Sequence, residues 1–429
     1  MQRRTFLSNL AGSVAAISAL PAAYAAKKTE SSTSNTGQAS SAVAAKGHTP
    51  VITLNGKSLD WTVKDGVKEF RLVAEPIEQE VAPGMKAKFW GYNGGSPGPT
   101  IEAVEGDKVR IFVSNKLPEH TTIHWHGLLL PNGMDGVGGL NQPQIPPGKT
   151  CVYEFTLSKS GTFMYHPHAD EQVQMALGMM GLFIVHPKNP HERRVDRDYA
   201  FLLAAYDIEP DTMTAKTATM TDFNLWTFNS RTFPVIQTLV ARQGERVRIR
   251  VGNLTMTNHP IHLHGHTFTV TGTDGGWVPT NAQWPEVTTD VAVGQMRVIE
   301  FIADAPGDWA FHCHKSHHTM GPMGHAVPNM LGVDQQKLSG HIEQLLPGKH
   351  YMAMGSNGMA EMQNMAGMGE MMPLPANTLP MMSGAGPYGP MEMGGMFTIL
   401  KVRPDQATGD YQDPGWYAQP KGSQAWIID

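Results

Sequence analysis

The sequence predicts an all-β protein that contains two copies of one sandwich domain. Short runs of alternating apolar and polar residues lie between Gly- and Pro-rich turns, as at 108–113 and 246–251, and a period of two is typical of half-buried strands. No segment shows a long helical period. The 45 glycines and 31 prolines among 429 residues agree with many short strands joined by turns.

The second copy is indicated by an internal repeat. Each of the two runs above leads into a histidine motif, and a second histidine motif follows further along the chain. The matching segments are 123–127 with 261–265 and 161–168 with 307–314. Repetition of whole segments at a large period indicates duplicated domains, which we place at 48–190 and 191–402.

The second copy is expected to contain an insertion. A closing strand follows the histidine motifs at 181–185 in the first copy, whereas the matching strand of the second copy comes only at 396–402. Residues 325–393 are therefore predicted to be a loop inserted before the last strand. Thirteen methionines lie in the segment 352–396. Residues 403–429 are predicted to be an irregular C-terminal tail.

The N-terminal residues are predicted to direct export. Residues 1–25 combine the pair Arg3-Arg4 with an apolar stretch and a small-x-small cleavage site, which is typical of a signal peptide. The arginine pair followed by Phe-Leu resembles the twin-arginine signal, so we expect a periplasmic protein. Residues 26–47 are predicted to be a flexible leader. No later apolar run is long enough to span a membrane, and the formal charge of −5 argues against nucleic-acid binding.

Four His-x-His pairs are the main candidates for chemistry. Side chains at i and i+2 of a strand point to the same face, so each pair presents two imidazoles together. A single pair is more often an ordinary detail of a strand. Eight convergent imidazoles suit three copper ions, whereas zinc takes only four ligands. The pairs are His124/His126, His166/His168, His262/His264 and His312/His314.

A separate copper site is expected beside the last pair. Cys313 lies between the two histidines of that pair, so its side chain points to the opposite face of the strand. Together with His259 and His318 it provides two imidazoles and a thiolate, and Met323 provides a weak axial sulfur. These are the donors of a blue copper site. Because Cys313 is covalently joined to both paired histidines, an electron taken up there has a short route to the cluster.

These motifs resemble those of the multicopper oxidases, most closely the two-domain laccase-type members. Residues 93–101 also resemble the family's lead-in to its first His-x-His-Gly. The resemblance implies two cupredoxin-like Greek-key β-sandwiches and four copper ions per active unit. It assigns the type 1 ion to His259, Cys313, His318 and Met323, and the type 2 ion to His124 and His264. It assigns the two type 3 ions to His126, His166, His168, His262, His312 and His314.

The resemblance implies two further features of the first domain. Asp135 matches an acid that orients water near the type 2 copper and assists proton delivery. No blue copper is expected in this domain, because the positions that match the type 1 ligands hold Thr121, Pro167, Gln172 and Leu177. In the second domain Thr319 stands where some members have an acid, so a proton route through that position is not expected.

The implied reaction is the one-electron oxidation of a reducing substrate at type 1, coupled to the four-electron reduction of dioxygen to water at the other three ions. The resemblance also implies a homotrimer, in which the cluster forms between neighbouring subunits. The Met-rich insertion favours Cu(I) as the substrate and a role in copper tolerance, because thioethers bind Cu(I).

Three alternatives remain beside the cuprous oxidase. One is a phenol-oxidising laccase without a role in copper homeostasis. A copper nitrite reductase is disfavoured because the cysteine lies in the second domain. A non-catalytic periplasmic copper store is disfavoured because it does not explain four paired histidine positions.

Overall fold

The computed structural model describes residues 47–428 apart from 83–84, 210–211, 219–222, 320–328, 332–351, 355–383 and 392. The predicted signal peptide, nearly all of the leader, Met323 and most of the insertion therefore lie outside the described residues. Within the described part the fold is mainly β, as predicted, and its α-helices are short: α1 (Glu171–Ala176) and α2 (Ser316–Thr319). No helix among these residues is long and apolar enough to cross a membrane.

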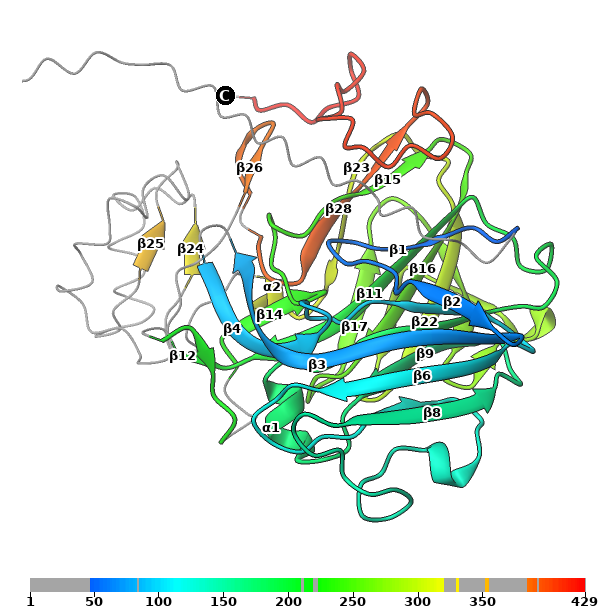
Figure 1. Cartoon of the computed structure of the whole chain (residues 1–429). Helices are drawn as coiled ribbons and strands as arrows, with labels where there is room; N and C mark the ends of the chain where they lie inside the picture. Colours follow the sequence, from blue (N-terminus) through cyan, green and yellow to red (C-terminus); the bar gives the residue numbers. More distant parts are fainter. Residues whose placement is uncertain are drawn as a thin grey trace, which may run out of the picture. The chain divides into compact units, whose positions relative to one another are not determined.

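The first part of the chain forms a sandwich of two sheets (Figure 1). The strand order is β12-β13-β4-β3-β6-β8 in one sheet, with β2 paired to β3, and β5-β10-β9-β7 in the other. Val109, Ile111 and Val113 of β6 are fully buried, whereas the residues between them are not, which is the predicted period of two. The strands are β2 (Trp61–Lys64), β3 (Val67–Ala82), β4 (Met85–Tyr92), β5 (Ile101–Val104), β6 (Lys108–Asn115), β7 (His124–His126), β8 (Thr150–Thr156), β9 (Gly161–His166), β10 (Gly181–His186), β12 (Ile208–Glu209) and β13 (Thr214–Ala215).

The later part of the chain forms a second sandwich around its own apolar core. One sheet has the order β1-β11-β16-β22-β18-β19, with β14 paired to β11 and β20 to β18, and the other has the order β15-β28-β23-β17-β21. The strands are β1 (Val51–Thr53), β11 (Arg197–Tyr206), β14 (Leu225–Phe228), β15 (Leu239–Arg242), β16 (Arg246–Asn253), β17 (His259–Leu263), β18 (Phe268–Thr273), β19 (Gly276–Trp277), β20 (Trp284–Glu286), β21 (Thr288–Val291), β22 (Met296–Ile302), β23 (Gly307–Cys313) and β28 (Phe397–Arg403).

The sequence repeat corresponds to a structural repeat. The order β5-β10-β9-β7 in the first sandwich matches β15-β28-β23-β17 in the second, and in each the first two strands are parallel and the others antiparallel. The registers agree as well, because His124 lies opposite His166 and His262 lies opposite His312. Each sandwich therefore presents its two His-x-His motifs on neighbouring strands.

The two sandwiches are also connected by strands that pair outside their own half and by a hydrogen bond from a buried arginine. β1 lies inside the range 48–190 predicted for the first domain but pairs with β11 of the second sandwich, and β13 lies after that range but pairs with β4 of the first sandwich. Leu202 of β11 lies in the first core. The buried guanidinium of Arg250 donates to Asp198 at 2.8 Å and to Thr162 at 2.7 Å. These contacts connect the two halves of the chain.

The remaining described elements are small. Two 3-10 turns, η1 (Asn132–Met134) and η2 (Thr280–Ala282), lie in loops. Within the insertion β24 (Asn329–Leu331) pairs with β25 (Met352–Met354), and β26 (Ala385–Gly386) pairs with β27 (Gly389–Pro390). The tail after β28 contains no strand in its described part and is held to β28, because Lys401 Nζ lies 2.6 Å from Asp413 and Arg403 donates to the Gly415 carbonyl at 2.7 Å.

Candidate copper centres

Three metal-binding side chains converge inside the second sandwich. The sulfur of Cys313 lies 3.5 Å from Nδ1 of His259 and 3.4 Å from Nδ1 of His318, and the two nitrogens are 3.1 Å apart. All three residues are buried. One thiol and two imidazoles that face a common point fit the blue copper ion that the motif implies. Met323, the predicted axial ligand, lies outside the described residues.

Three elements bring these ligands together. His259 begins β17, Cys313 ends β23, and His318 lies in α2 shortly after β23. β17 and β23 are antiparallel neighbours, with Ile261 opposite Cys313. Met396, directly before β28, links the last two ligands: its carbonyl accepts from the Cys313 N–H at 3.0 Å, and its N–H donates to the His318 carbonyl at 2.9 Å.

Burial and hydrogen bonding set the protonation states at this site. Nε2 of His259 lies 2.7 Å from Oγ1 of Thr255, so its proton is held there and Nδ1 is left for a metal. Burial lowers the pKa of His259 to about 3, with nearby Lys315 and His317 adding to the effect. Burial raises the pKa of the Cys313 thiol to about 11. In the metal-free protein the imidazole is neutral at pH 7 and the thiol is protonated, so copper binding displaces the thiol proton.

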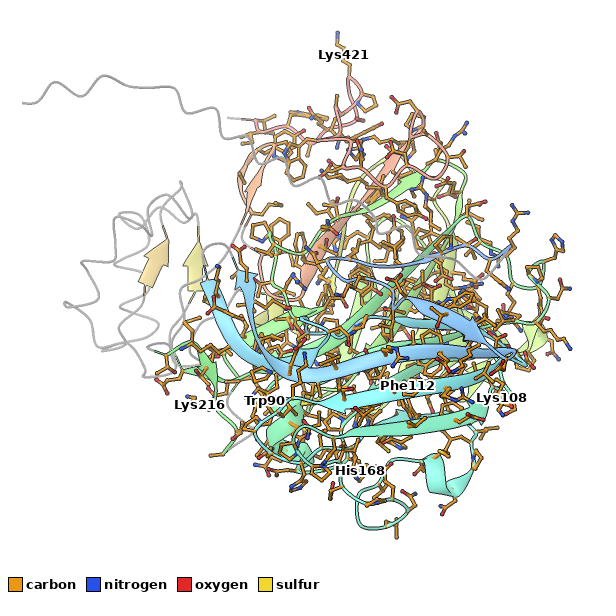
Figure 2. The ribbon with its side chains drawn as sticks, viewed as in Figure 1. Trp90, Lys108, Phe112, His168, Lys216 and Lys421 are labelled. Atoms are coloured by element: carbon orange, nitrogen blue, oxygen red, sulfur yellow. The ribbon has the colours of Figure 1, made fainter. Side chains whose placement is uncertain are left out.

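The first sandwich contains a cluster of four imidazoles. The ligand atoms of His124, His126 and His166 lie within 4.8 Å of one another, and Nδ1 of His126 is 3.3 Å from Nε2 of His166. The ring of His168, which lies between β9 and α1 (Figure 2), is 5.8 Å from that of His124 at an angle of 84°. The paired histidines of this half therefore converge, as predicted.

The second sandwich contains the corresponding cluster. Nε2 of His264 lies 3.0 Å from Nε2 of His312, and the ring of His262 is 5.4 Å from that of His314 at 71°. His264 contacts His312 just as His126 contacts His166 in the first cluster. Imidazole nitrogens this close together are better explained as metal ligands than as packing residues of an apolar core.

Backbone carbonyls fix the orientation of four of the eight rings. Each carbonyl accepts a hydrogen bond from Nδ1 of one histidine, which leaves Nε2 free to bind a metal. The pairs and distances are His124 with Asp135 (2.7 Å), His262 with Val287 (2.6 Å), His166 with Pro167 (3.0 Å) and His312 with Cys313 (2.8 Å).

The two clusters do not meet within one chain. Ring contacts among the described residues join histidines of the first cluster to one another and those of the second to one another, and none joins the two clusters. Each cluster supplies four imidazoles, which is half of the predicted set of eight.

Asp135 lies directly beside the first cluster. Its carboxylate is 3.5 Å from Nδ1 of His124 and also 3.5 Å from the side-chain amide of Asn141. The next residue, Gly136, has a φ of +94°, and a Cβ there would lie only 1.7 Å from the carbonyl oxygen of Ile123. The loop therefore packs against the chain just before β7, and only glycine fits at this point.

Glu171, a charged neighbour of the first cluster, is absent from the residues predicted above. Its carboxylate lies 3.8 Å from Nδ1 of His166 and 3.8 Å from Nε2 of His168. It occupies the position that His317 has in the second repeat. Aligning the two repeats beyond the histidine pair would have revealed it, because this position differs between them.

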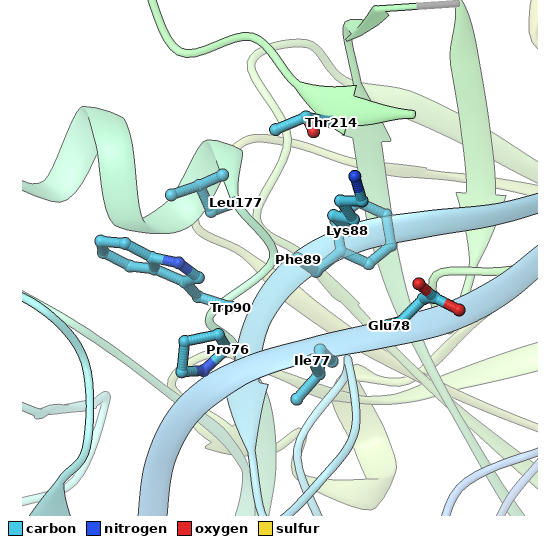
Figure 3. A pocket seen from close by; sticks show the side chains of 8 residues that line it. All are labelled: Pro76, Ile77, Glu78, Lys88, Phe89, Trp90, Leu177 and Thr214. Atoms are coloured by element: carbon cyan, nitrogen blue, oxygen red, sulfur yellow. The ribbon is translucent and has the colours of Figure 1, made fainter. Parts of the chain in front are cut away.

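A separate hollow of about 330 Å³ lies against the β3–β4 hairpin (Figure 3). No predicted copper ligand lines it, although Leu177 occupies the position that matches Met323 in the repeat. The lining residues are Pro76, Ile77, Glu78, Lys88, Phe89, Trp90, Leu177 and Thr214. The hollow is therefore distinct from the copper centres.

Two sandwich repeats with paired histidines and a buried set of two histidines and a cysteine define a copper protein of the cupredoxin class. Two family models, both described as multicopper oxidase, match this chain at residues 74–190 and 207–330. Together they cover both histidine clusters and most of both sandwiches, although β2 and β28 lie outside the matched ranges. The chain belongs to the multicopper oxidases, with the blue copper ligand set in the second domain.

Curated relatives match parts of the chain. A probable nitrite reductase-hydroxylamine oxidoreductase fusion protein of Kuenenia stuttgartiensis is 29% identical over 276 residues, which cover 61% of this chain and 31% of that protein. Copper resistance protein A of Escherichia coli is 38% identical over 141 residues, covering 33% and 23%. Laccase-2 of Cryptococcus neoformans is 44% identical over 129 residues, covering 29% and 21%. The chain thus spans a third or less of these relatives' length.

A solved structure matches most of the chain. The blue copper oxidase from Nitrosomonas europaea is 25% identical to this chain, with a TM-score of 0.57, and the match covers 78% of this chain and 85% of that one. This likeness agrees with the two-sandwich architecture.

Proposed function

We propose that this chain oxidises a reducing substrate, one electron at a time, at the His259–Cys313–His318 site and passes the electrons to a three-copper cluster, where dioxygen is reduced to water. The position of Cys313 carries the proposal. Its sulfur belongs to the blue copper set, while the adjacent His312 and His314 belong to the paired-histidine cluster. Copper supplies the redox chemistry when bound. Four electrons and four protons convert one dioxygen into two waters.

Copper content and oxygen uptake test this proposal. The loaded protein should hold about four copper ions per chain, have a blue visible band and consume one dioxygen for every four electrons supplied. Cys313→Ser should lose the blue band and keep the other copper. About two ions per chain with nitrite reduction and no oxygen uptake would instead indicate a nitrite reductase. A variable copper content without turnover would indicate a copper store.

We further propose a homotrimer, because each chain holds two half-clusters that do not meet. Exposed apolar side chains adjoin both halves: Leu129 (63% exposed) closely follows the first pair, and Val287 (48% exposed) bears the carbonyl that binds His262. Cyclic symmetry brings the first half-cluster of one copy to the second half-cluster of the next. Sedimentation should give a trimer, and a fully active monomer would contradict this assembly.

The repeat favours a revised allocation of the type 2 ion. The family resemblance assigns His124 and His264 to it. The strand pairing, however, makes His262 the counterpart of His124. His124 lies opposite His166, and His262 lies opposite His312, which is the matching residue of the second repeat. His264 instead contacts His312, as His126 contacts its partner. We propose that His124 and His262 hold type 2. His262→Ala should then abolish the type 2 electron paramagnetic resonance signal, and its loss in His264→Ala alone would restore the first assignment.

Asp135 is proposed to orient water and assist proton delivery at the type 2 ion. Its carboxylate lies 3.5 Å from Nδ1 of His124, close enough to act through the ligand shell. Asp135→Asn should slow oxygen reduction while leaving the blue band and the copper content unchanged.

Cu(I) is the proposed substrate, and phenols are the alternative. The match to copper resistance protein A supports a role in copper tolerance, and so do the thirteen methionines. Three of these belong to the second sandwich, because Met396 is fully buried and Met391 and Met393 pack against the core. The ten methionines at 352–382 are therefore the candidates for Cu(I) binding.

Replacing these ten methionines with leucine tests the substrate. Leucine keeps the apolar volume and removes the thioether, so Cu(I) oxidation should fall while oxidation of a bulky phenol stays the same. Equal loss of both activities would contradict a specific Cu(I) role. Unchanged Cu(I) oxidation would favour the phenol-oxidising laccase.

Periplasmic location through the twin-arginine route is also proposed. The sequence feature that supports this location is the pair Arg3-Arg4, which precedes an apolar stretch and a cleavage site. Replacing both arginines with lysine should leave the precursor in the cytoplasm in a fractionation experiment. Unchanged export would contradict this route.

A further inference from the structure

An aromatic side chain outside the predicted ligand set lies against the blue copper site. Trp226 on β14 stacks on His318, with ring centroids 3.7 Å apart and planes at 19°. The same indole meets His259 edge-on at 5.8 Å and His317 at 6.0 Å. Trp226 thus contacts both imidazole ligands, although it is far from either in sequence.

The ligand imidazoles themselves are not accessible to a substrate. His259 is 0% and His318 is 1% exposed, and Trp226 is 7% exposed. His317 is exposed, and its ring lies 4.2 Å from that of His318. Among the described residues, a reducing molecule therefore meets His317 before it meets a blue copper ligand.

The short helix α2, which carries His318, depends on the stacking contact with Trp226 to orient the His318 ring. α2 has only four residues, too few to fix a side chain by helical hydrogen bonds alone. Trp226 is held by strand pairing, since β14 pairs with β11, an inner strand that also pairs with β16, and Trp226 lies opposite Ala205. The rigid strand thereby presents a flat surface that determines the plane of the His318 ring.

We propose that Trp226 is a positioning residue that holds His318 in its copper-binding orientation, and that reducing substrates deliver electrons through the Trp226–His318–His317 group of rings. The inference deepens the proposed oxidase function and rests on it. In each transfer the donor loses one electron and the type 1 copper goes from Cu(II) to Cu(I). The rings only bridge the two and are neither oxidised nor reduced.

Spectroscopy of Trp226→Leu and Trp226→Phe tests the positioning role. Trp226→Leu removes the stack, so the blue band should shift or broaden and the copper hyperfine splitting should change, whereas Trp226→Phe should keep a spectrum close to that of the parent. Trp426→Leu is the matched control, because Trp426 is 80% exposed in the tail. A Trp226→Leu spectrum identical to the parent's would overturn this role.

Anaerobic reduction of the type 1 copper by hydroquinone, followed by stopped flow, tests the electron route. Trp226→Leu should slow this reduction at least tenfold. His317→Ala should keep the blue spectrum and mainly raise the apparent KM for hydroquinone. Parent rates in both variants would overturn the route.

The outcome for the oxidase function is separate from the outcome for Trp226. If the parent protein binds type 1 copper but consumes no oxygen, the proposed oxidase function fails, whereas the spectral comparison still decides the role of Trp226.

Discussion

Thr255 shows how a single hydroxyl group can determine which nitrogen of a ligand faces the metal. Its Oγ1 lies 2.7 Å from Nε2 of His259 and 2.8 Å from Oδ1 of Asn253. With the Nε2 proton held by Thr255, Nδ1 keeps its lone pair toward Cys313. Partners of this kind orient metal ligands and maintain their basicity.

Thr255→Val should therefore weaken the blue copper site without removing a ligand. The loss of a hydrogen bond to a metal-binding histidine typically costs about 10- to 100-fold in metal affinity. Competitive copper titration followed by the blue band measures this loss. Thr255→Ser keeps the hydroxyl and is the matched control. Equal affinity in the valine variant and the parent would show that Thr255 does not support His259.

The sequence predicts the ligand candidates but not the residues around them. His259, Cys313 and His318 are close in sequence to the repeated motifs, and strand alternation alone places Cys313 on the face opposite its neighbours. Trp226 and Glu171 reach the sites through strand pairing and a turn after the motif. No local period encodes the contact of Trp226, so it required the structure, whereas Glu171 could have been found by aligning the two repeats beyond the histidine pair.

At the scale of elements, the closing strand completes the blue copper site. Gly395, just before β28, has a φ of +57°, and a Cβ there would lie 2.3 Å from the carbonyl oxygen of His318. The neighbouring Gly394 N–H donates to the Thr319 carbonyl at 2.7 Å. The chain that returns from the insertion thus packs directly on α2.

Gly395→Ala should displace α2 and impair the blue copper site. The added Cβ collides with backbone, and the left-handed conformation is strained for alanine, so we expect a stability loss of about 1–3 kcal/mol together with a weaker blue band. Gly409→Ala is the matched control, because Gly409 has a φ of +74° and nothing within 4 Å of its ideal Cβ. Thermal unfolding and copper titration measure both effects. Equal effects of the two variants would rule out a specific role for the contact.

Strand positions are predicted well where the pattern is local. The runs expected at 108–113 and 181–185 correspond to β6 and β10, and the closing strand expected at 396–402 corresponds to β28. The pairing of β1 with β11 is not predictable in this way. A three-residue strand has no characteristic period, and its partner lies far along the chain.

For the whole molecule, the buried histidines make the metal-free protein sensitive to acid. Burial lowers the pKa of both His166 and His259 to about 3, from an ordinary 6.5. Between these values the unfolded chain binds protons that the folded chain excludes, so stability falls as the pH drops below about 6.5. Each group contributes a slope of about 1.4 kcal/mol per pH unit.

The thermal midpoint of the metal-free protein should therefore fall steadily from pH 7 to pH 4.5. His166→Gln cannot take up this proton and should lower the slope by about 1.4 kcal/mol per pH unit, which unfolding in urea at several pH values would measure. The same slope in the variant and the parent would show that His166 is not buried as a neutral group.

Assembly at this scale determines whether the eight imidazoles can form one cluster. One inactive variant carries His126→Ala and His166→Ala in the first half-cluster, and another carries His264→Ala and His312→Ala in the second. If clusters form between copies, mixing the two in denaturant, refolding and reloading with copper should restore activity to about one quarter of the parent's, because one interface in four combines two intact halves. Each variant treated alone is the control and should stay inactive. If each cluster instead forms within a single chain, the mixture contains no complete set of ligands and stays inactive.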